Sequence, residues 1–399
     1  MQMKFGFSFC RGNILPSAGL MAAFLLPAPM LADEPIRIGA TMSETGAYST
    51  QGIPARNGYR LCARHANDQG GVLGRDVEFV IHDDQSDSDK AIVLYEKLIT
   101  EVKVDAVMGP YGSTLTEAVA PVTEKYRQVM ISPLAATTSI WEQGREYLFM
   151  VLPPAELFLA GLIDMADEND LGKVAILAEY ALFPKAAGTG AADLARERGM
   201  EVVLDETYSS GTRDFSGLLE RFDSKGVEVF GMAASSLGDF ILVVDQMAEM
   251  DIDVAMFGTS GAVNEFQKAL GERAEYAYGL SAWEPSLENP GIERFVSDYE
   301  EEFDTAPSFH AAGAYGSCQL FLEAIGRAES LDADKLRETL LDLEMTTVFS
   351  DYAVDERGYQ TANKGLFIQW QDGEKVVVWP EDVATGQARF PTPGWKDRN

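Results

Sequence analysis

The chain has 399 residues, with 63 Asp or Glu against 32 Lys or Arg, and its formal net charge at pH 7 is −31. So acidic a surface repels nucleic acid and anionic lipid, and its self-repulsion favours solubility. The length exceeds one ordinary domain and predicts two. We therefore expect a soluble two-domain protein with no nucleic-acid partner.

The first 32 residues have the pattern of a secretory signal. Lys4 and Arg11 flank the start of an apolar stretch over residues 14–26, and small residues follow at Ala28 and Ala32. The alternative is a membrane anchor, but the stretch is interrupted by a proline and a glycine and is shorter than the ~20 apolar residues of a membrane span. We expect cleavage near Ala32 and release of the mature chain into the periplasm.

Apolar runs alternate with helical patterns along the rest of the chain. The runs are continuous, as in residues 174–178, which is typical of parallel strands buried on both faces. This alternation predicts an α/β fold with helices covering parallel sheets. Strands are expected near residues 35–40, 76–82, 104–108, 129–132, 147–151, 173–178, 201–207, 227–231, 254–257 and 277–281. A hairpin is expected over residues 365–379, with its turn at Asp372 and Gly373.

An acidic run follows the second expected strand. Residues 83–89 carry four Asp side chains, yet they lack the central glycine and the distant Glu of a calcium loop. Asp and Ser at a helix start cap free backbone N–H groups. We therefore expect helix capping here and no metal site.

The sequence offers few residues for catalysis. It has only three histidines, at 65, 82 and 310, and no GxSxG, HExxH or CxxC motif. Residues 188–193 partly match a dinucleotide-binding loop, but they lie within an expected helix and lack the third glycine. We expect no enzyme activity and no cofactor; an exported hydrolase is the alternative.

Two loops at the carboxyl ends of neighbouring strands favour a bound ligand. Residues 109–117 and residues 132–139 are rich in Gly, Ser and Thr, and each follows a short apolar strand. Helix N-termini with free N–H groups and hydroxyls bind anions, carboxylates in particular. Ordinary capping would explain either loop alone, but two such loops on adjacent strands favour a carboxylate site.

The chain resembles the periplasmic solute-binding proteins of ABC importers, specifically the branched-chain amino acid-binding (Leu/Ile/Val-type) family. The resemblance rests on the strand, Gly-bearing loop, helix and second strand of residues 35–90, and on residues 213–219 and 311–319. It implies a receptor that delivers a small solute to a permease in the inner membrane, without catalysis and as a monomer. A ligand sensor that regulates another receptor is an alternative.

The resemblance also implies the domain organisation. The fold is expected to be α/β, with two doubly wound parallel-sheet lobes joined by three crossover segments, near residues 151–154, 282–285 and 345–349. The N-terminal lobe would comprise residues 33–152 plus 283–346, and the C-terminal lobe 153–282 plus 347–399.

Site residues follow from the same resemblance. It implies that a serine in the first loop and a small-residue run in the second hold the ligand's carboxylate, and that aromatic and polar residues of both lobes line the site. The residues so placed are Gln51, Tyr111, Ser113, Ala135, Ala136, Thr137, Phe183, Ser235 and Ser260.

One position departs from the family pattern. Where amino acid binders of this family carry an acidic residue that pairs with the ligand's ammonium group, this chain has Ser260 or an immediate neighbour. A buried ammonium group without a counter-ion is costly. A carboxylated or small polar ligand without an α-amino group is therefore favoured. Branched-chain amino acids remain the alternative if Asp239 or Glu284 supplies the charge.

The cysteines leave two possibilities open. Cys10 follows Phe9 instead of a small residue, which argues against lipoprotein attachment, and it lies within the signal. Cys62 and Cys318 fall on expected helices that the resemblance places in the same lobe. They form either two buried thiols or a disulfide, and connectivity cannot be read from sequence.

Overall fold

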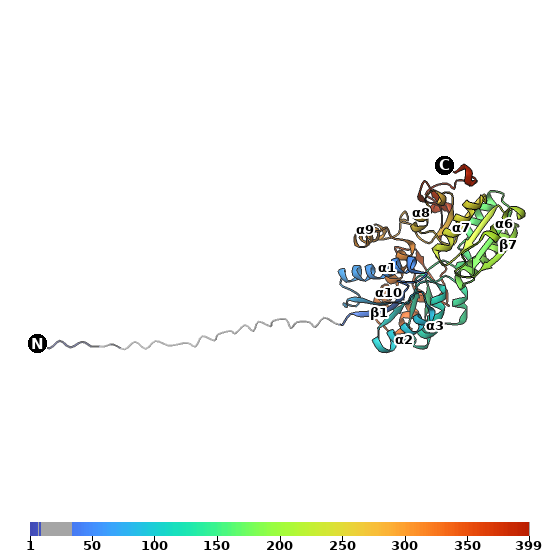
Figure 1. The fold of residues 1–399 in the computed structure, drawn as a ribbon. Coiled ribbons are helices and arrows are strands. Elements are labelled where there is room, and N and C mark those ends of the chain that lie inside the picture. Colours follow the sequence, from blue (N-terminus) through green and yellow to red (C-terminus); the bar gives the residue numbers. More distant parts are fainter. Residues whose placement is uncertain (7, 9–33, 399) are drawn as a thin grey trace. The chain divides into compact units, whose positions relative to one another are not determined.

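The computed structural model describes residues 1–6, 8 and 34–398 of the chain. The apolar part of the expected signal and its cleavage region near Ala32 lie outside these residues, as does Cys10. None of the helices in the described part of the chain combines the length and apolar character that a membrane crossing requires. Residues 34–398 contain two large sheets, each covered by helices, and a short two-stranded ribbon (Figure 1).

The first sheet has five parallel strands in the order β2–β1–β3–β4–β5. The apolar strand β1 lies between β2 and β3, and its Ile38 pairs with Phe79 on one side and with Ala106 on the other. Every residue of β1 except Arg37 is buried beneath the covering helices. The strands are β1 (Ile36–Met42), β2 (Val77–Asp83), β3 (Ala106–Met108), β4 (Met130–Ser132) and β5 (Leu148–Met150).

Six α-helices accompany this sheet: α1 (Ser49–Asp68), α2 (Ser88–Lys97), α3 (Ser113–Lys125), α9 (Ile292–Phe303), α10 (Phe309–Ala328) and α11 (Ala333–Asp342). Helices α1 and α10, far apart in sequence, pack closely. At Gly58 an added Cβ would lie 2.2 Å from the carbonyl oxygen of Ala311, so this approach requires glycine. The same pair of helices carries Cys62 and Cys318, which are joined in a disulfide. Of the two possibilities that the sequence leaves open, the disulfide is the one observed.

The second sheet has seven strands in the order β14–β13–β10–β9–β8–β6–β7. Five of them are parallel, and the last two in sequence form an antiparallel hairpin at one edge. Both turn residues of the hairpin, Asp372 and Gly373, have positive φ angles, as the tight primed turn requires, and the predicted hairpin is confirmed. The strands are β6 (Lys173–Glu179), β7 (Glu201–Tyr208), β8 (Val229–Ala233), β9 (Met256–Thr259), β10 (Tyr278–Ser281), β13 (Leu366–Gln371) and β14 (Glu374–Trp379).

Five α-helices accompany the second sheet: α4 (Ala160–Glu168), α5 (Leu182–Glu197), α6 (Ser216–Lys225), α7 (Leu237–Met250) and α8 (Asn264–Leu270). Helix α4 packs on β9, β10 and β13, and α5 packs on β6, β7 and β8. The partial dinucleotide motif of residues 188–193 lies inside α5, where it forms helix and no loop.

Short elements complete the fold. The ribbon consists of β11 (Met345–Thr346) and β12 (Asp351–Tyr352). The single-turn helices are η1 (Leu98–Val102), η2 (Thr138–Gln143), η3 (Ala155–Leu157), η4 (Gly271–Ala274), η5 (Glu381–Val383) and η6 (Trp395–Asp397). The chain passes from the first sheet to the second between β5 and α4, returns between β10 and α9, and passes across again between α11 and β13.

The acidic run after β2 serves local structure. Asp87 caps α2 by accepting a hydrogen bond from the backbone N–H of Lys90 at 2.8 Å, as predicted. Asp84 is fully buried and accepts from the hydroxyls of Thr41 at 2.8 Å and Ser43 at 2.6 Å. In the part of the chain that the structure describes, no group of three or more His, Cys, Asp or Glu side chains is placed to hold a metal ion.

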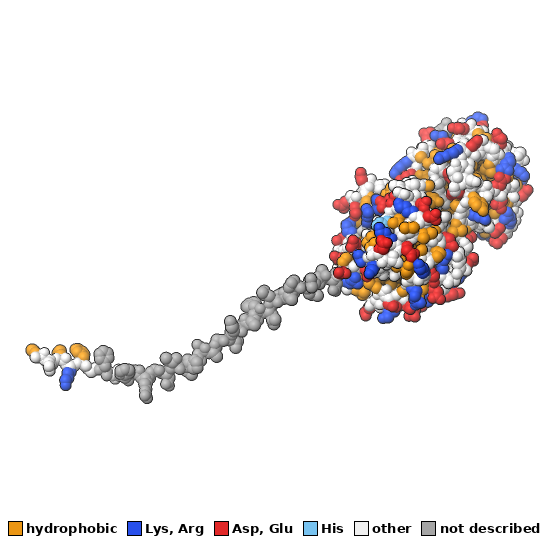
Figure 2. All heavy atoms as spheres, turned by 60° about the horizontal axis from the view of Figure 1, so that its bottom comes forward, with side chains coloured by type: hydrophobic (Ala, Val, Ile, Leu, Met, Phe, Trp, Pro, Cys, Tyr) orange, Lys and Arg blue, Asp and Glu red, His pale blue; other side chains and the backbone are white. Residues whose placement is uncertain are grey.

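Acidic side chains are spread over the visible face of residues 34–398, with Lys and Arg interspersed among them (Figure 2). Ion pairs such as Arg127 with Asp334 and Arg221 with Glu206 offset part of the repulsion locally. This described face carries no continuous basic patch of the kind that nucleic acid would need.

Candidate functional site

A cavity of about 60 Å³ lies between segments that follow strands of both sheets. On the first-sheet side it is lined by α1, the start of α3, the loop after β4 and the start of α10; on the second-sheet side by α5 and the segments after β8 and β9. Such positions at strand carboxyl ends are where wound sheets bind ligands. A single water molecule needs about 10–15 Å³ of such a cavity volume. The cavity therefore suits a small solute and is too small for a peptide.

Most of the lining is apolar. Its side chains are Leu115, Leu134, Leu152, Phe158, Phe183, Leu237, Phe240, Val263 and Phe309. Phe183 and Phe158 pack edge to face with ring centroids 4.9 Å apart. Among the described residues that line the cavity there is no Lys, Arg, Asp or Glu. The site therefore offers shape and neutral hydrogen-bonding groups to a ligand, with no fixed charge.

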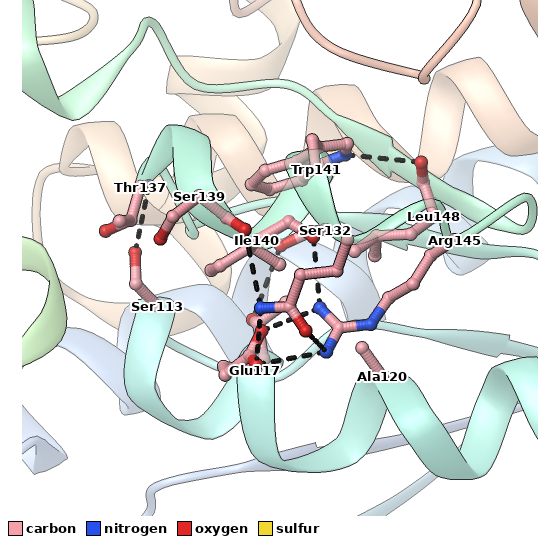
Figure 3. A network of polar contacts seen from close by, with 12 residues as sticks. Ser113, Glu117, Ala120, Ser132, Thr137, Ser139, Ile140, Trp141, Arg145 and Leu148 are labelled. Carbon is pink, nitrogen blue, oxygen red and sulfur yellow. Dashed lines mark hydrogen bonds and ion pairs between the residues drawn. The ribbon is translucent and has the colours of Figure 1, made fainter.

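The start of α3 supplies one polar group of the cavity. Ser113 is the first residue of this helix, and Gly112 before it has no side chain to cap the free N–H groups. The Ser113 hydroxyl oxygen accepts the backbone N–H of Thr137 at 3.2 Å (Figure 3). It also accepts the backbone N–H of Ala136 at 3.1 Å. Both lone pairs of this oxygen are thereby engaged, so the hydroxyl hydrogen is left to donate. A free donor beside a helix N-terminus favours an anionic ligand group.

An ion pair beneath the cavity holds the second loop against α3. Arg145 and Glu117 form two parallel bonds, of 2.6 and 3.0 Å, and the guanidinium group also donates to the carbonyl oxygen of Ile140 at 3.0 Å (Figure 3). Trp141 fastens the same loop to β5 through a 3.2 Å bond to the carbonyl of Leu148. The loop leads into the 3₁₀ helix η2, and these contacts attach the segment after Ala136 and Thr137 to α3 and β5.

We expect Arg145→Met to weaken ligand binding about tenfold. Arg145 is largely buried, and without it the loop that carries Ala136 loses its attachment to α3 and the donor geometry loosens. Calorimetry on the folded variant measures the effect. The control is Arg127→Met, which breaks the exposed Arg127–Asp334 pair away from the cavity and should leave affinity unchanged. Equal affinities of the two variants would show that the Arg145–Glu117 ion pair does not shape the site.

The structure brings seven of the nine predicted site residues to this cavity: Gln51, Tyr111, Ser113, Ala136, Phe183, Ser235 and Ser260. Ala135 and Thr137 are buried beside it and do not line it. The amide N–H of Ser235 donates to Glu179 at 2.8 Å, and its carbonyl accepts the side-chain N–H of Gln51 at 3.5 Å. The Ser260 hydroxyl bonds to the backbone of Ala234.

Aromatic side chains form one wall of the cavity. The ring of Tyr111 lies 5.5 Å from that of Tyr48 and 5.6 Å from that of His310. Burial, followed by the proximity of Tyr48 and Glu179, raises the pKa of Tyr111 above its usual value. Burial, followed by the positive charge of Lys375, lowers the pKa of His310 to about 3. The wall therefore presents neutral phenol and imidazole groups at physiological pH.

The charged residues considered as partners for an ammonium group lie in adjoining grooves. Asp239 lines a groove next to the cavity together with Glu179 and Tyr48. Glu284 lies in another groove, where it pairs with Lys375 at 2.9 Å. Neither Asp239 nor Glu284 lines the cavity itself.

Sequence reasoning missed several lining residues. Tyr48 belongs to the loop directly after β1, so the rule that led to residues 109–117 would also have found it. Phe158 and Phe309 look like ordinary core residues in the sequence. His310 is the second residue of α10, which follows α9 and not a strand, and no local pattern indicates it.

Comparisons with known proteins agree with this geometry. The family model described as "Periplasmic binding protein" matches residues 35–375. A curated relative, Leu/Ile/Val-binding protein homolog 7 of Brucella suis biovar 1, is 25% identical over 394 residues, which cover 93% of this chain and 98% of the relative.

Two solved structures have a similar fold. The branched-chain amino acid transporter substrate-binding protein LivJ from Streptococcus pneumoniae, in complex with isoleucine, has a TM-score of 0.78 at 23% identity, covering 87% of this chain and 100% of its own. A solute-binding protein of an ABC transporter from Rhodopseudomonas palustris, in complex with 3,4-dihydroxybenzoic acid, has a TM-score of 0.75 at 21% identity, covering 86% and 95%. At these identities the two structures establish the fold.

Proposed function

The chain belongs to the periplasmic binding protein family, and on that premise we propose that it is the substrate-binding component of an ABC importer. It captures a small carboxylated solute between two lobes in the periplasm and delivers it to a permease in the inner membrane. The protein acts as a monomer after its signal is cleaved near Ala32, and it catalyses no reaction. The lobes are residues 33–152 plus 283–346 and residues 153–282 plus 347–399, a division supported by the two sheets and the three chain passages between them.

The observation that carries the proposal is the donor at the start of α3 within an uncharged cavity. The Ser113 hydroxyl, with both lone pairs engaged by the amides of the second loop, can only donate. Residues 113–115 begin the helix, so their N–H groups have no partner within it. A ligand carboxylate placed here would gain charge-assisted hydrogen bonds and the favourable end of the helix dipole.

The same cavity disfavours an ammonium group. An ammonium taken from water into a site lined by no acidic side chain loses its hydration without a counter-charge. Ser260 lines the cavity, and its hydroxyl is bound to the backbone of Ala234. We therefore favour a carboxylic acid with an apolar body. The ligand named for the Rhodopseudomonas palustris neighbour shows that this fold accommodates an acid of that kind.

A branched-chain amino acid is the second candidate. The names of the curated relatives and the isoleucine bound to a structural neighbour favour it. So does the position of Glu179, which is almost fully buried behind Ser235 and binds its amide. Tyr48 lines both the cavity and the groove that contains Glu179 and Asp239. A shift of its side chain would open a path between these carboxylates and the ligand.

Ligand capture is proposed to close the two lobes about the chain passages. Contact across the cavity already exists between Gln51 of α1 and the carbonyl of Ser235 after β8. A ligand that touches both walls binds the closed form more tightly than the open form and so shifts the population toward closure.

A thermal-unfolding screen tests the proposal. Short aliphatic acids, aromatic acids, amides, urea and the branched-chain amino acids are added singly to the purified mature chain. A ligand present at 100 times its dissociation constant should stabilise the fold by about 2.7 kcal/mol. Stabilisation by at least one carboxylic acid is the expected result. Stabilisation by amides or urea alone, with none by any acid, would contradict a carboxylate site.

A further inference from the structure

Two residues that line the cavity each have a buried polar atom with no hydrogen-bond partner. These atoms are the side-chain oxygen Oε1 of Gln51 and the ring nitrogen Nδ1 of His310. Both side chains are at most 5% exposed. Buried polar atoms in folded proteins are nearly always bonded, so an unpaired atom on a residue that lines a cavity indicates a partner supplied by the ligand.

Each of the two residues restricts what that partner can be. Gln51 uses its amide nitrogen on the carbonyl of Ser235, so its oxygen is left to accept and needs a donor. The buried imidazole of His310 is neutral, because burial and the charge of Lys375 hold its pKa near 3. A neutral imidazole offers one donor and one acceptor. A group that both donates and accepts matches this pair.

A hydroxyl group meets these requirements, whereas an ammonium group is disfavoured by its charge. An ammonium could donate to Gln51 and, in the tautomer whose Nδ1 is unprotonated, to His310, but the positive charge of Lys375 that acts on His310 would repel it. No acidic residue among the described lining residues would compensate for that repulsion. A hydroxyl carries no charge, and it can donate to one residue while it accepts from the other.

We propose that Gln51 and His310 recognise a hydroxyl group of the ligand, and that the natural ligand is a small carboxylic acid with an apolar body and at least one hydroxyl. This inference rests on the proposed function and specifies its substrate class. The rings of Tyr48, Tyr111 and Phe309 form the apolar surface beside these groups.

Matched pairs of acids test the inference by calorimetry on the wild-type mature chain. One pair is 4-hydroxybenzoate and benzoate, and the other is 2-hydroxy-4-methylpentanoate and 4-methylpentanoate. Because a site built around a hydroxyl rejects the analogue that lacks it, at least one hydroxylated acid should bind about tenfold or more tightly than its partner. If neither hydroxylated acid binds more tightly than its partner, the inference is overturned.

Two variants assign the preference to these residues. Gln51→Met and His310→Phe each remove one polar partner at similar volume, and each should reduce the hydroxyl preference to less than about threefold. Gln69→Met and His82→Phe, outside the cavity, serve as matched controls and should retain it. If His310→Phe does not fold, the hydroxyl preference of Gln51→Met alone tests the proposal. A hydroxyl preference unchanged in a folded Gln51→Met variant would remove Gln51 from the recognition and contradict the proposal.

The outcome also separates this inference from the function on which it rests. Tight binding of plain and hydroxylated acids alike would leave the carboxylate receptor intact and overturn only the hydroxyl recognition. Failure of all four acids to bind, together with binding of leucine, would overturn both.

Discussion

Ser113→Ala is expected to weaken binding of a carboxylated ligand by roughly 10- to 150-fold. The substitution removes the hydroxyl hydrogen that Ser113 offers to the cavity at the start of α3. It also takes away the acceptor of two buried amides, those of Ala136 and Thr137. A charge-assisted hydrogen bond and the partner groups left unpaired together account for about 1.5–3 kcal/mol. Calorimetry with an acid identified by the thermal screen measures the change.

Two controls isolate the role of this hydroxyl. Ser113→Thr keeps a hydroxyl at the same position and should recover part of the affinity. Ser216→Ala removes a serine from the start of α6, away from the cavity, and should leave affinity unchanged. Wild-type affinity in a folded Ser113→Ala variant would show that the carboxylate is held elsewhere.

Lys375→Met is expected to lower the free energy of unfolding by about 3 kcal/mol. Lys375 and Glu284 form a buried pair, with side chains only 9% and 11% exposed, that joins the hairpin strand β14 to the segment after β10. Removing the cation leaves the Glu284 carboxylate buried and unpaired, and such single removals cost more than the pair itself contributes. Denaturant unfolding monitored by fluorescence gives the free energy.

The double variant Lys375→Met with Glu284→Leu should recover most of the loss, because neither charge then remains buried. Lys125→Met breaks the exposed pair with Glu96 and should cost less than about 1 kcal/mol. A loss in Lys375→Met no larger than that in Lys125→Met would mean that water reaches Glu284 freely.

The sheets could be predicted because their strands are continuous apolar runs between glycine-rich breaks. Each strand expected between residues 35 and 281 is present, with bounds that differ by a few residues; β3, for example, begins at Ala106 where residue 104 was expected. The hairpin followed from Asp372 and Gly373, which favour positive φ. The ribbon of β11 and β12 was not predicted, because two-residue strands leave no periodic signal.

The site was predictable where it follows strands and not where it depends on helix packing. Ser113 begins the helix that follows β3 and Ala136 lies in the loop after β4, and the resemblance to a known family indicated both. His310 reaches the cavity only because α10 packs on α1, a contact between segments about 250 residues apart. The disulfide between Cys62 and Cys318 depends on the same packing. Distances of this kind are set by the tertiary fold and leave no mark on local sequence.

The ion pair between Arg145 and Glu117 could not be predicted from the sequence for a similar reason. Arg145 and Glu117 are separated by 28 residues and belong to different elements, and each looks like an ordinary surface charge in the sequence. Their pairing, with Arg145 largely buried, appears only once the loop after β4 lies on α3.

We propose that the chain binds a carboxylic acid in a cavity whose described lining has no counter-charge for an ammonium group. Leucine and 4-methylpentanoate share one carbon skeleton and differ only in the α-amino group, so calorimetry of the wild-type mature chain with this pair measures the contribution of the ammonium alone. We predict that 4-methylpentanoate binds at least about tenfold more tightly than leucine, because a buried ammonium here has no acidic partner in the lining. Tighter binding of leucine would contradict the account and show that a carboxylate such as Glu179 reaches the ligand.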